Sequence, residues 1–277
     1  MKYIVEEVNM IQEAMIQSFD GTKLFFKKNL PVSTKAVIVI VHGLCEHLGR
    51  YDYLTERLNN SDISVYRFDH RGHGKSEGKR VFYNDFNEIV DDVNCVVDLA
   101  IKENPGLPIF VLGHSMGGYA VALFGTKYPN KVTGLITSGA LTRYNNKMAG
   151  DLPIDKPADT YFPNELGNGV CSNPDIVEAY VNDPLVEKQI SVGLMNSMYN
   201  GVQWLKKNAE KFTDSVLILH GCCDGLVSEK DSREFFSDIA SKDKSLKIYA
   251  NLFHEILNEP CRDEIIDEII CWLNHRI

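Results

Sequence analysis

The stretch Val111-Leu-Gly-His-Ser-Met-Gly-Gly118 decides the fold, because it places a serine in a sharp turn between a strand and a helix. Residues 109–112 are all apolar, as in a short buried strand, and residues 119–128 have helical spacing. Between them Gly113 and Gly117 lack the Cβ atoms that would keep the two arms of the turn apart. We expect this turn to strain the Ser115 backbone and to present its hydroxyl above the sheet edge, at the positive end of the helix. The alternative, a helix-capping serine in a glycine-rich turn, fits the flanking strand and helix less well.

Length and composition restrict the class of protein. The chain has 277 residues, 44% apolar and 24% charged, as in a globular protein with one large α/β domain or two modest ones. The net charge of -9 argues against nucleic acid or an anionic membrane surface as the main partner. The longest aliphatic run, residues 36–41, is far shorter than the ~20 residues of a membrane span, and no secretory signal is expected at the start.

The cysteines predict a reducing, cytoplasmic location. They are odd in number, scattered, and form no C-x-x-C pair, which argues against both a disulfide framework and a zinc site. The seven are Cys45, Cys95, Cys171, Cys222, Cys223, Cys261 and Cys271.

Strands alternate with helices along most of the chain, which predicts a mostly parallel sheet with helices on both faces. The expected strands are 6–18, 23–30, 36–41, 63–68, 109–112, 132–137, 216–219 and 246–249. The expected helices outside the middle of the chain are 51–60, 86–102, 119–128, 229–240 and 262–274. Ligands of such folds bind at the carboxyl ends of the strands.

The alternation stops between residues 143 and 207, where five prolines occur without a clear strand. Helical stretches are expected there near 175–182 and 189–206. We therefore expect two parts, a core of residues 1–142 and 208–277 and a lid inserted over the active edge of the sheet.

A serine hydroxyl needs a base to take its proton, and in a strand-turn-helix fold of this type the acid and then the histidine follow the serine. Of the histidines after Ser115, His275 lies in the last helix and His220 ends a strand. His254 lies in the loop after strand 246–249 and is therefore the expected base. Asp224, in the loop leaving the preceding strand, is the expected acid, although a turn residue before a glycine is the alternative reading. The other aspartates near this strand are Asp214, which precedes it, and Asp231 and Asp238, which are expected to be solvated on the following helix.

A tetrahedral intermediate needs backbone N–H donors. Met116, directly after the serine, and Leu44, in the loop after strand 36–41, are the expected oxyanion donors. Nearby histidines are expected to be structural, with His42 packing under the turn and His70 and His73 in loop structure. Glu46, His47 and Arg50 are expected to pair locally.

Five separated blocks resemble the monoacylglycerol lipase/lysophospholipase group of α/β-hydrolases, in the right order and over nearly the whole chain. They are Val41-His-Gly-Leu-Cys-Glu-His-Leu-Gly-Arg-Tyr51, Asp69-His-Arg-Gly-His-Gly-Lys-Ser-Glu-Gly78, Gly113-His-Ser-Met-Gly-Gly118, Asp183-Pro-Leu185 and Leu246-Lys-Ile-Tyr-Ala-Asn-Leu-Phe-His254. The resemblance implies an eight-stranded sheet with a mobile lid, and the same triad and oxyanion donors as above. One departure is Leu44, where members of the group often carry a smaller residue.

These observations predict a serine ester hydrolase that acts on a single-chain acyl ester such as a monoacylglycerol, without a metal or organic cofactor. The alternatives are a lysophospholipase, a general carboxylesterase or thioesterase, an aminopeptidase in which Glu165 holds the substrate amine, and a non-catalytic receptor for a small ligand. Apolar lid residues are candidates for an acyl-chain tunnel, and an ordinary core helix is the equal alternative for them. They are Val192, Leu194, Met195, Met198, Tyr199 and Trp204, of which Met195, Met198 and Tyr199 are the expected substrate contacts. The lid can make transient membrane contact, and composition leaves the oligomeric state open.

Overall fold

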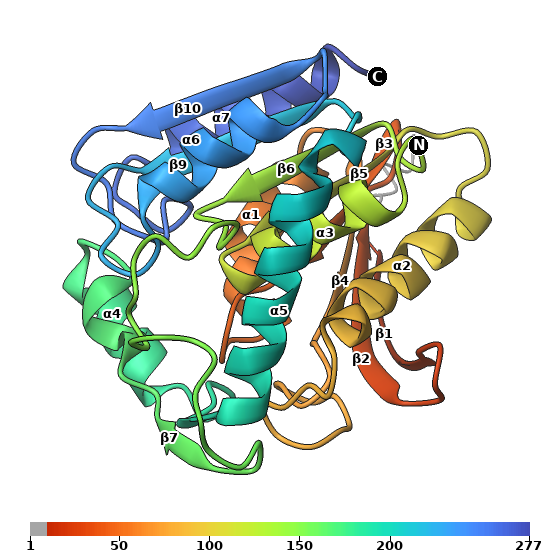
Figure 1. Cartoon of the computed structure of the whole chain (residues 1–277). Coiled ribbons are helices and arrows are strands. Elements are labelled where there is room, and N and C mark those ends of the chain that lie inside the picture. The colour runs from red at the N-terminus through yellow and green to blue at the C-terminus, as the bar shows by residue number, and fades with distance from the viewer. Residues whose placement is uncertain (1–9) are drawn as a thin grey trace, which may run out of the picture.

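An eight-stranded sheet forms the centre of the protein (Figure 1). This computed structural model describes residues 10–277, so the first part of the strand expected at 6–18 lies outside the described residues. The strand order is β1-β2-β4-β3-β5-β6-β9-β10, antiparallel for the pairs β1–β2 and β2–β4 and parallel for the other five. The expected mostly parallel, eight-stranded sheet is confirmed. Its strands are β1 Met10–Gln17, β2 Lys23–Leu30, β3 Ala36–Val41, β4 Ile63–Phe68, β5 Ile109–His114, β6 Gly134–Ser138, β9 Val216–Gly221 and β10 Lys244–Tyr249.

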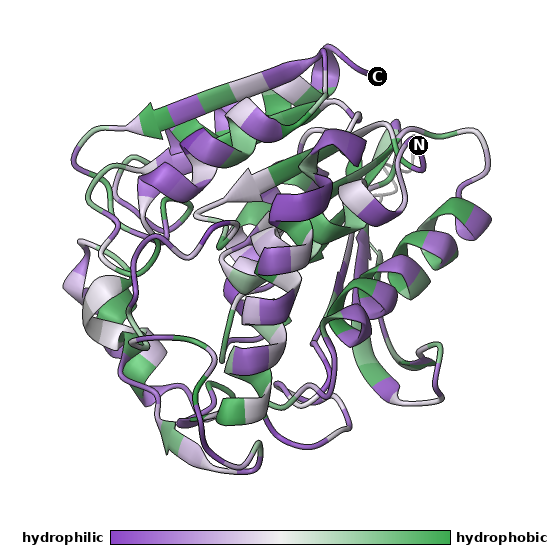
Figure 2. Cartoon of the chain, in the orientation of Figure 1, coloured by the Kyte–Doolittle hydropathy of each residue, from purple (hydrophilic) through white to green (hydrophobic). Residues whose placement is uncertain are grey.

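Helices cover both faces of this sheet, because each presents an apolar side to it. On one face lie α2 (Phe86–Glu103), α3 (Met116–Lys127) and α6 (Glu229–Asp238). On the other lie α1 (Asp52–Asn59) and α7 (Arg262–Asn274). Apolar and polar residues alternate around α2, as Figure 2 shows, and its buried residues are apolar except for Asp92. Within the described part of the chain, no helix has both the length and the apolar character of a membrane span.

The strands that carry the expected site residues end at one edge of the sheet. The register pairs Val41 of β3 with Gly113 of β5, and Gly113 with Thr137 of β6. Thr137 in turn pairs with Ile218 of β9. Because these pairings are parallel, the loops after β3, β5, β6, β9 and β10 all leave from the same edge.

The chain between β6 and β9, residues 139–215, leaves the sheet and is called the insertion below. Its strands β7 (Tyr161–Pro163) and β8 (Gln189–Ser191) form a small antiparallel sheet, so the expectation of no strand there was wrong. Three-residue strands are too short to give a periodic pattern. Helices α4 (Pro174–Asn182) and α5 (Val192–Asn208) are where helical spacing was expected, and α5 packs on α3 (Figure 1).

Helix α5 begins later than expected because the Ser191 side chain accepts a hydrogen bond from the N–H of Leu194 and caps the helix. Short 3-10 helices complete the structure. They are η1 Leu48–Tyr51, η2 Leu166–Gly169 and η3 Ala209–Lys211.

Asp231 of α6 fixes the start of the insertion, although we expected it to be solvated. Its side chain is fully buried and accepts hydrogen bonds from the backbone N–H groups of Arg143 and Tyr144, at 2.8 Å each, and of Asn145, at 3.0 Å. Three consecutive donors on one carboxylate compensate for its burial. Asp238 is exposed, as expected, and pairs with Arg143.

We predict that Asp231→Ala lowers the free energy of unfolding by about 3 kcal/mol, because three buried N–H groups lose their charged acceptor. Asp238→Ala is the matched control on the same helix, and the loss of its half-exposed ion pair changes this free energy by about 1 kcal/mol or less. Urea denaturation of both variants measures the two values. Equal effects of the two substitutions would contradict the anchoring role of Asp231.

Candidate active site

Ser115 occupies a strained turn between β5 and α3. Its backbone has φ 54° and ψ −116°. Residues other than glycine rarely adopt this conformation, which costs about 1–3 kcal/mol. The surrounding structure holds the turn in place, since the N–H of Ser115 donates to the carbonyl oxygen of Ser138 on β6 at 2.8 Å. The serine therefore lies at the carboxyl end of β5, where the sequence placed it.

Two glycines make this turn possible. A Cβ atom on Gly113 would lie 2.2 Å from the carbonyl oxygen of Gly117, and one on Gly117 would lie 2.1 Å from that of Val41 on β3. Either contact is far inside van der Waals distance, so larger residues would push α3 away from the strands.

His254 and Asp224 meet in the loops that follow β10 and β9. The Nδ1 atom of His254 lies 2.6 Å from Oδ2 of Asp224, and both side chains are buried. An ionised carboxylate only accepts hydrogen bonds, so Nδ1 carries the hydrogen and Nε2 keeps the lone pair that a base needs. Asp224 does not act as a simple turn residue, although its Oδ1 also accepts from the N–H groups of Leu226 and Val227 at 2.9 Å each.

His220 is a third member of this group that sequence reasoning set aside. Its Nε2 lies 3.0 Å from Oδ2 of Asp224, and its Nδ1 lies 2.7 Å from the hydroxyl of Ser232 on α6. His220 is fully buried beneath the carboxylate. The only sequence signal for this contact was that His220 lies at the end of the strand before the Asp224 loop, four residues before Asp224.

Asp224 and His254 shift each other's pKa. Burial favours the neutral form of Asp224, but the charge of His254 and the hydrogen bonds from His220 and His254 hold the pKa of the carboxyl well below its usual range. Burial likewise favours neutral His254, and the Asp224 carboxylate outweighs it and raises the pKa of the imidazole. Asp224 therefore stays ionised and stabilises a protonated His254.

The loop after β3 brings a backbone segment close to the serine. A Cβ on Gly43 would lie 3.1 Å from Cβ of Ser115, so this loop and the turn are in contact. Leu44 follows Gly43, and Met116 is the first residue of α3, where N–H groups have no acceptor within the helix. Both residues line the same cavity as Ser115 and His254.

A buried ion-pair network joins this loop to the histidine loop. The Arg50 guanidinium binds both carboxylate oxygens of Glu255, at 2.6 and 2.9 Å, and one of Glu46, at 2.9 Å. Glu46 also accepts from the N–H of Gly43. The expected local pairing of Glu46 with Arg50 is confirmed, and the sequence did not indicate Glu255, which is adjacent to His254 in the chain.

The His47 side chain forms an ion pair with the insertion and not with Glu46 or Arg50, although its Nδ1 also accepts a hydrogen bond from the N–H of Gly49. Its Nε2 lies 2.8 Å from Oδ2 of Asp183, so the expected local pairing was wrong for this residue. The N–H of Glu187 also donates to the carbonyl oxygen of Cys45 at 2.9 Å. These two contacts tie the loop after β3 to the insertion.

The histidines beneath the turn are structural, as expected. Nε2 of His42 accepts a hydrogen bond from the N–H of His70 at 2.9 Å, and its Nδ1 lies 2.8 Å from the carbonyl oxygen of Gly43. Burial lowers the pKa of His42 and of His73 to about 3, so both stay neutral. Within residues 10–277, no group of three or more His, Cys, Asp or Glu residues is arranged to hold a metal ion.

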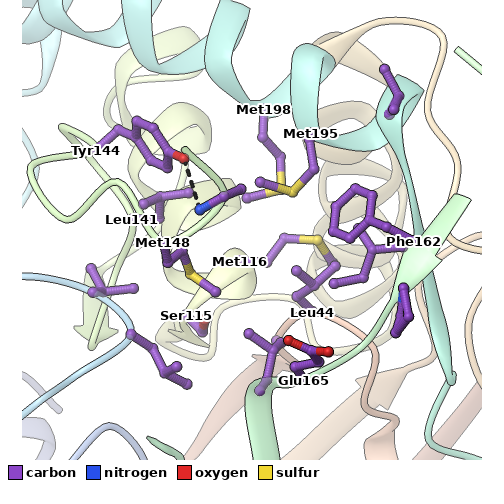
Figure 3. Close-up of a pocket in the computed structure, with 18 of the residues that line it drawn as sticks. Leu44, Ser115, Met116, Leu141, Tyr144, Met148, Phe162, Glu165, Met195 and Met198 are labelled. Atoms are coloured by element: carbon purple, nitrogen blue, oxygen red, sulfur yellow. Dashed lines mark hydrogen bonds between the residues drawn. The ribbon is translucent and has the colours of Figure 1, made fainter. Parts of the chain in front are cut away.

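A cavity of about 800 Å³ opens between the sheet edge and the insertion. Ser115 and His254 lie in its wall. Figure 3 shows four methionines around it: Met116, which follows Ser115 in the chain, Met148, and Met195 and Met198 from α5. Flexible thioether side chains adapt to the shape of an apolar ligand.

The lid residues named from the sequence divide into two groups. Val192, Met195 and Met198 line the cavity, whereas Leu194, Tyr199 and Trp204 do not, and Trp204 packs on Phe86 of α2 instead. Other wall residues come from loops of the insertion and from β7 and η2, which are too short to give a periodic pattern. They include Leu141, Tyr144, Met148, Phe162 and Leu166. Glu165 adds a carboxylate to the wall (Figure 3).

Comparison with known proteins gives consistent matches over most of the chain. A family model described as serine aminopeptidase, S33, matches residues 32–261. A monoacylglycerol lipase of Mycolicibacterium smegmatis is 33% identical over 254 residues, which cover 86% of this chain and 88% of the relative. A monoglyceride lipase of Homo sapiens is 34% identical over 268 residues, which cover 93% of this chain and 88% of the relative. The crystal structure of Paleococcus ferrophilus monoacylglycerol lipase matches with a TM-score of 0.81 at 31% identity, covering 92% of this chain and 99% of that chain.

Proposed function

Because the chain belongs to the monoacylglycerol lipase group of the α/β-hydrolase superfamily, which makes it a serine carboxylic ester hydrolase, we propose that it cleaves monoacylglycerols with Ser115, His254 and Asp224. The hydrogen bond between His254 and Asp224 in the wall that also holds Ser115 is the observation that carries this proposal. The monoacylglycerol lipases named above supply the substrate class.

In the first half of the reaction the Ser115 hydroxyl attacks the ester carbonyl. His254 takes the hydroxyl proton on Nε2, and the Asp224 carboxylate stabilises the imidazolium that forms. The backbone N–H groups of Leu44 and Met116 are the proposed donors to the oxyanion. Collapse of the tetrahedral intermediate releases glycerol, which takes its proton from His254, and leaves the acyl group on Ser115.

In the second half, water attacks the acyl-enzyme. His254 removes the proton from the water, and the same N–H groups stabilise the second intermediate. The products are the fatty acid and free Ser115. No step in this sequence requires a redox or Lewis-acid group, because the bond broken is a carboxylic ester.

The cavity wall supports a neutral, single-chain substrate. The methionine side chains offer an apolar surface for the acyl chain, and the carboxylate of Glu165 can accept hydrogen bonds from the hydroxyl groups of glycerol. The same carboxylate would attract the amine of a peptide, so aminopeptidase activity is the competing proposal suggested by the family description.

Residues 143–207 are the proposed lid. In this segment Met148 and Val181 are 41% and 53% exposed, which supports transient contact with a lipid surface when the substrate enters. The abundant free thiols support a reducing compartment, and we include a cytoplasmic location in the proposal.

We expect the highest kcat/KM for monoacylglycerols of medium or long chain, compared with lysophospholipids, acetyl and butyryl esters, acyl-thioesters and aminoacyl amides. Ser115→Ala should lower turnover by on the order of 10⁶-fold, because the nucleophile is lost. Ser241→Ala, at a buried serine that does not line the cavity, is the matched control and should leave turnover unchanged. Preferred cleavage of aminoacyl amides, or full activity of Ser115→Ala, would rule out the proposal.

The rate should fall as the pH is lowered, because His254 must be neutral to accept a proton. The Asp224 carboxylate raises the pKa of His254 above 6.5, so the midpoint of kcat/KM should lie above pH 6.5. In Asp224→Asn, burial is opposed only by the charges of Glu255 and Glu46, which contribute less than Asp224, so the midpoint should move to lower pH while kcat falls by on the order of 10⁴-fold. An unchanged midpoint in this variant would show that Asp224 does not control the base.

A further inference from the structure

Two adjacent cysteines lie directly before the proposed catalytic acid. Cys222 and Cys223 are both exposed, and their Sγ atoms are 3.7 Å apart. They open the loop between β9 and α6, and Asp224 is the next residue in the chain. The mechanism above uses neither thiol.

The same two residues hold the loop that carries His254. The N–H of Cys222 donates to the carbonyl oxygen of Tyr249 at 2.9 Å. The N–H of Cys223 donates to the carbonyl oxygen of Leu252, also at 2.9 Å. In the opposite direction, the N–H of Asn251 donates to Sγ of Cys222 at 3.3 Å. The backbone of this cysteine pair thus joins the acid loop to the histidine loop, in addition to the contact between Asp224 and His254.

We propose that Cys222 and Cys223 form a thiol pair that low-molecular-weight disulfides oxidise to an internal disulfide, and that this oxidation switches off hydrolysis. The proposal rests on the proposed function in one respect, because the switch is read out as loss of ester hydrolysis. The oxidation itself is independent of that function.

The chemistry is an ordinary pair of exchange steps. The thiolate of Cys222, whose Sγ accepts the N–H of Asn251, attacks one sulfur of a disulfide such as oxidised glutathione. A mixed disulfide forms and one thiolate leaves. Cys223 then loses its proton to water and attacks the Cys222 sulfur, which closes the Cys222–Cys223 bond and releases the second thiolate. The protein loses two hydrogen atoms, and the small disulfide is reduced to two thiols.

Closing this bond must move the backbone. The sulfur atoms have to approach from 3.7 Å to about 2.0 Å, within a ring that contains the peptide bond between the two residues. The N–H groups of that segment then lose their alignment with Tyr249 and Leu252. Since Asp224 is the next residue, its 2.6 Å contact with His254 is displaced as well.

Other cysteines are less suited to this chemistry. Cys45 and Cys171 are buried, and Cys95 and Cys261 are only partly accessible. Cys271 is exposed on α7, but its Sγ has His275 as its neighbour and no second thiol. Cys271→Ser is therefore the matched control for an exposed thiol that is not part of a pair.

The test is to treat the full-length protein with oxidised glutathione, alkylate the remaining thiols, and locate the modification by peptide mass spectrometry. Turnover of a monoacylglycerol is measured in parallel before and after reduction with dithiothreitol. We expect the Cys222–Cys223 peptide to lose two hydrogen atoms and turnover to fall by about 10- to 100-fold, the range for a misplaced catalytic group, with recovery on reduction.

Variants separate the possible outcomes. Cys223→Ser should stop at the mixed disulfide on Cys222, the double variant Cys222→Ser/Cys223→Ser should keep its activity under oxidation, and Cys271→Ser should respond like the unaltered protein. The proposal would be overturned if no internal disulfide formed, or if the disulfide formed without loss of turnover. Inactivation of the double variant by oxidised glutathione would also overturn it. Absence of turnover in the reduced protein would instead count against the proposed hydrolase function, while the mass measurement still decides whether the disulfide forms.

Discussion

Crowding at the turn between β5 and α3 is the constraint on which the rest of the site depends. Gly117 passes so close to the carbonyl oxygen of Val41 that no side chain fits, and Ser115 takes a positive φ as a result. This arrangement places the serine, the first N–H of α3 and the loop after β3 within one small volume. The strain is tolerable because β5, which leads into the turn, and its neighbour β3 are fully buried and closely packed.

The remaining parts of the site reach this point from strands that end at the same edge. Loops are mobile unless something holds them, and here buried charges do so. Arg50 connects Glu46, which binds the N–H of Gly43, with Glu255, which adjoins His254. The loop after β3 and the loop that carries His254 are therefore connected through one guanidinium group. The buried carboxylate of Asp231 likewise holds residues 143–145 of the insertion, through their backbone N–H groups.

Features with a strong local cause could be predicted from the sequence. The turn at Ser115 and the buried strands belong to this class, because glycine spacing and apolar runs act within a few residues. The contact between Asp224 and His254 followed from chain order and strand ends. Contacts with distant partners that neither a local pattern nor the order of the strand ends indicates could not be predicted. The burial of Asp231 is set by backbone groups 86 to 88 residues away, and no local pattern marks the contact of His47 with Asp183 or the wall position of Met148.

The central claim is that the turn and His254 together make one serine hydroxyl reactive. Covalent labelling with a fluorophosphonate, followed by intact and peptide mass spectrometry, tests it most directly. We expect one adduct per chain, on Ser115, and labelling that slows by several orders of magnitude in a folded His254→Ala variant. An adduct on another residue, or equal labelling rates with and without the imidazole, would contradict the claim.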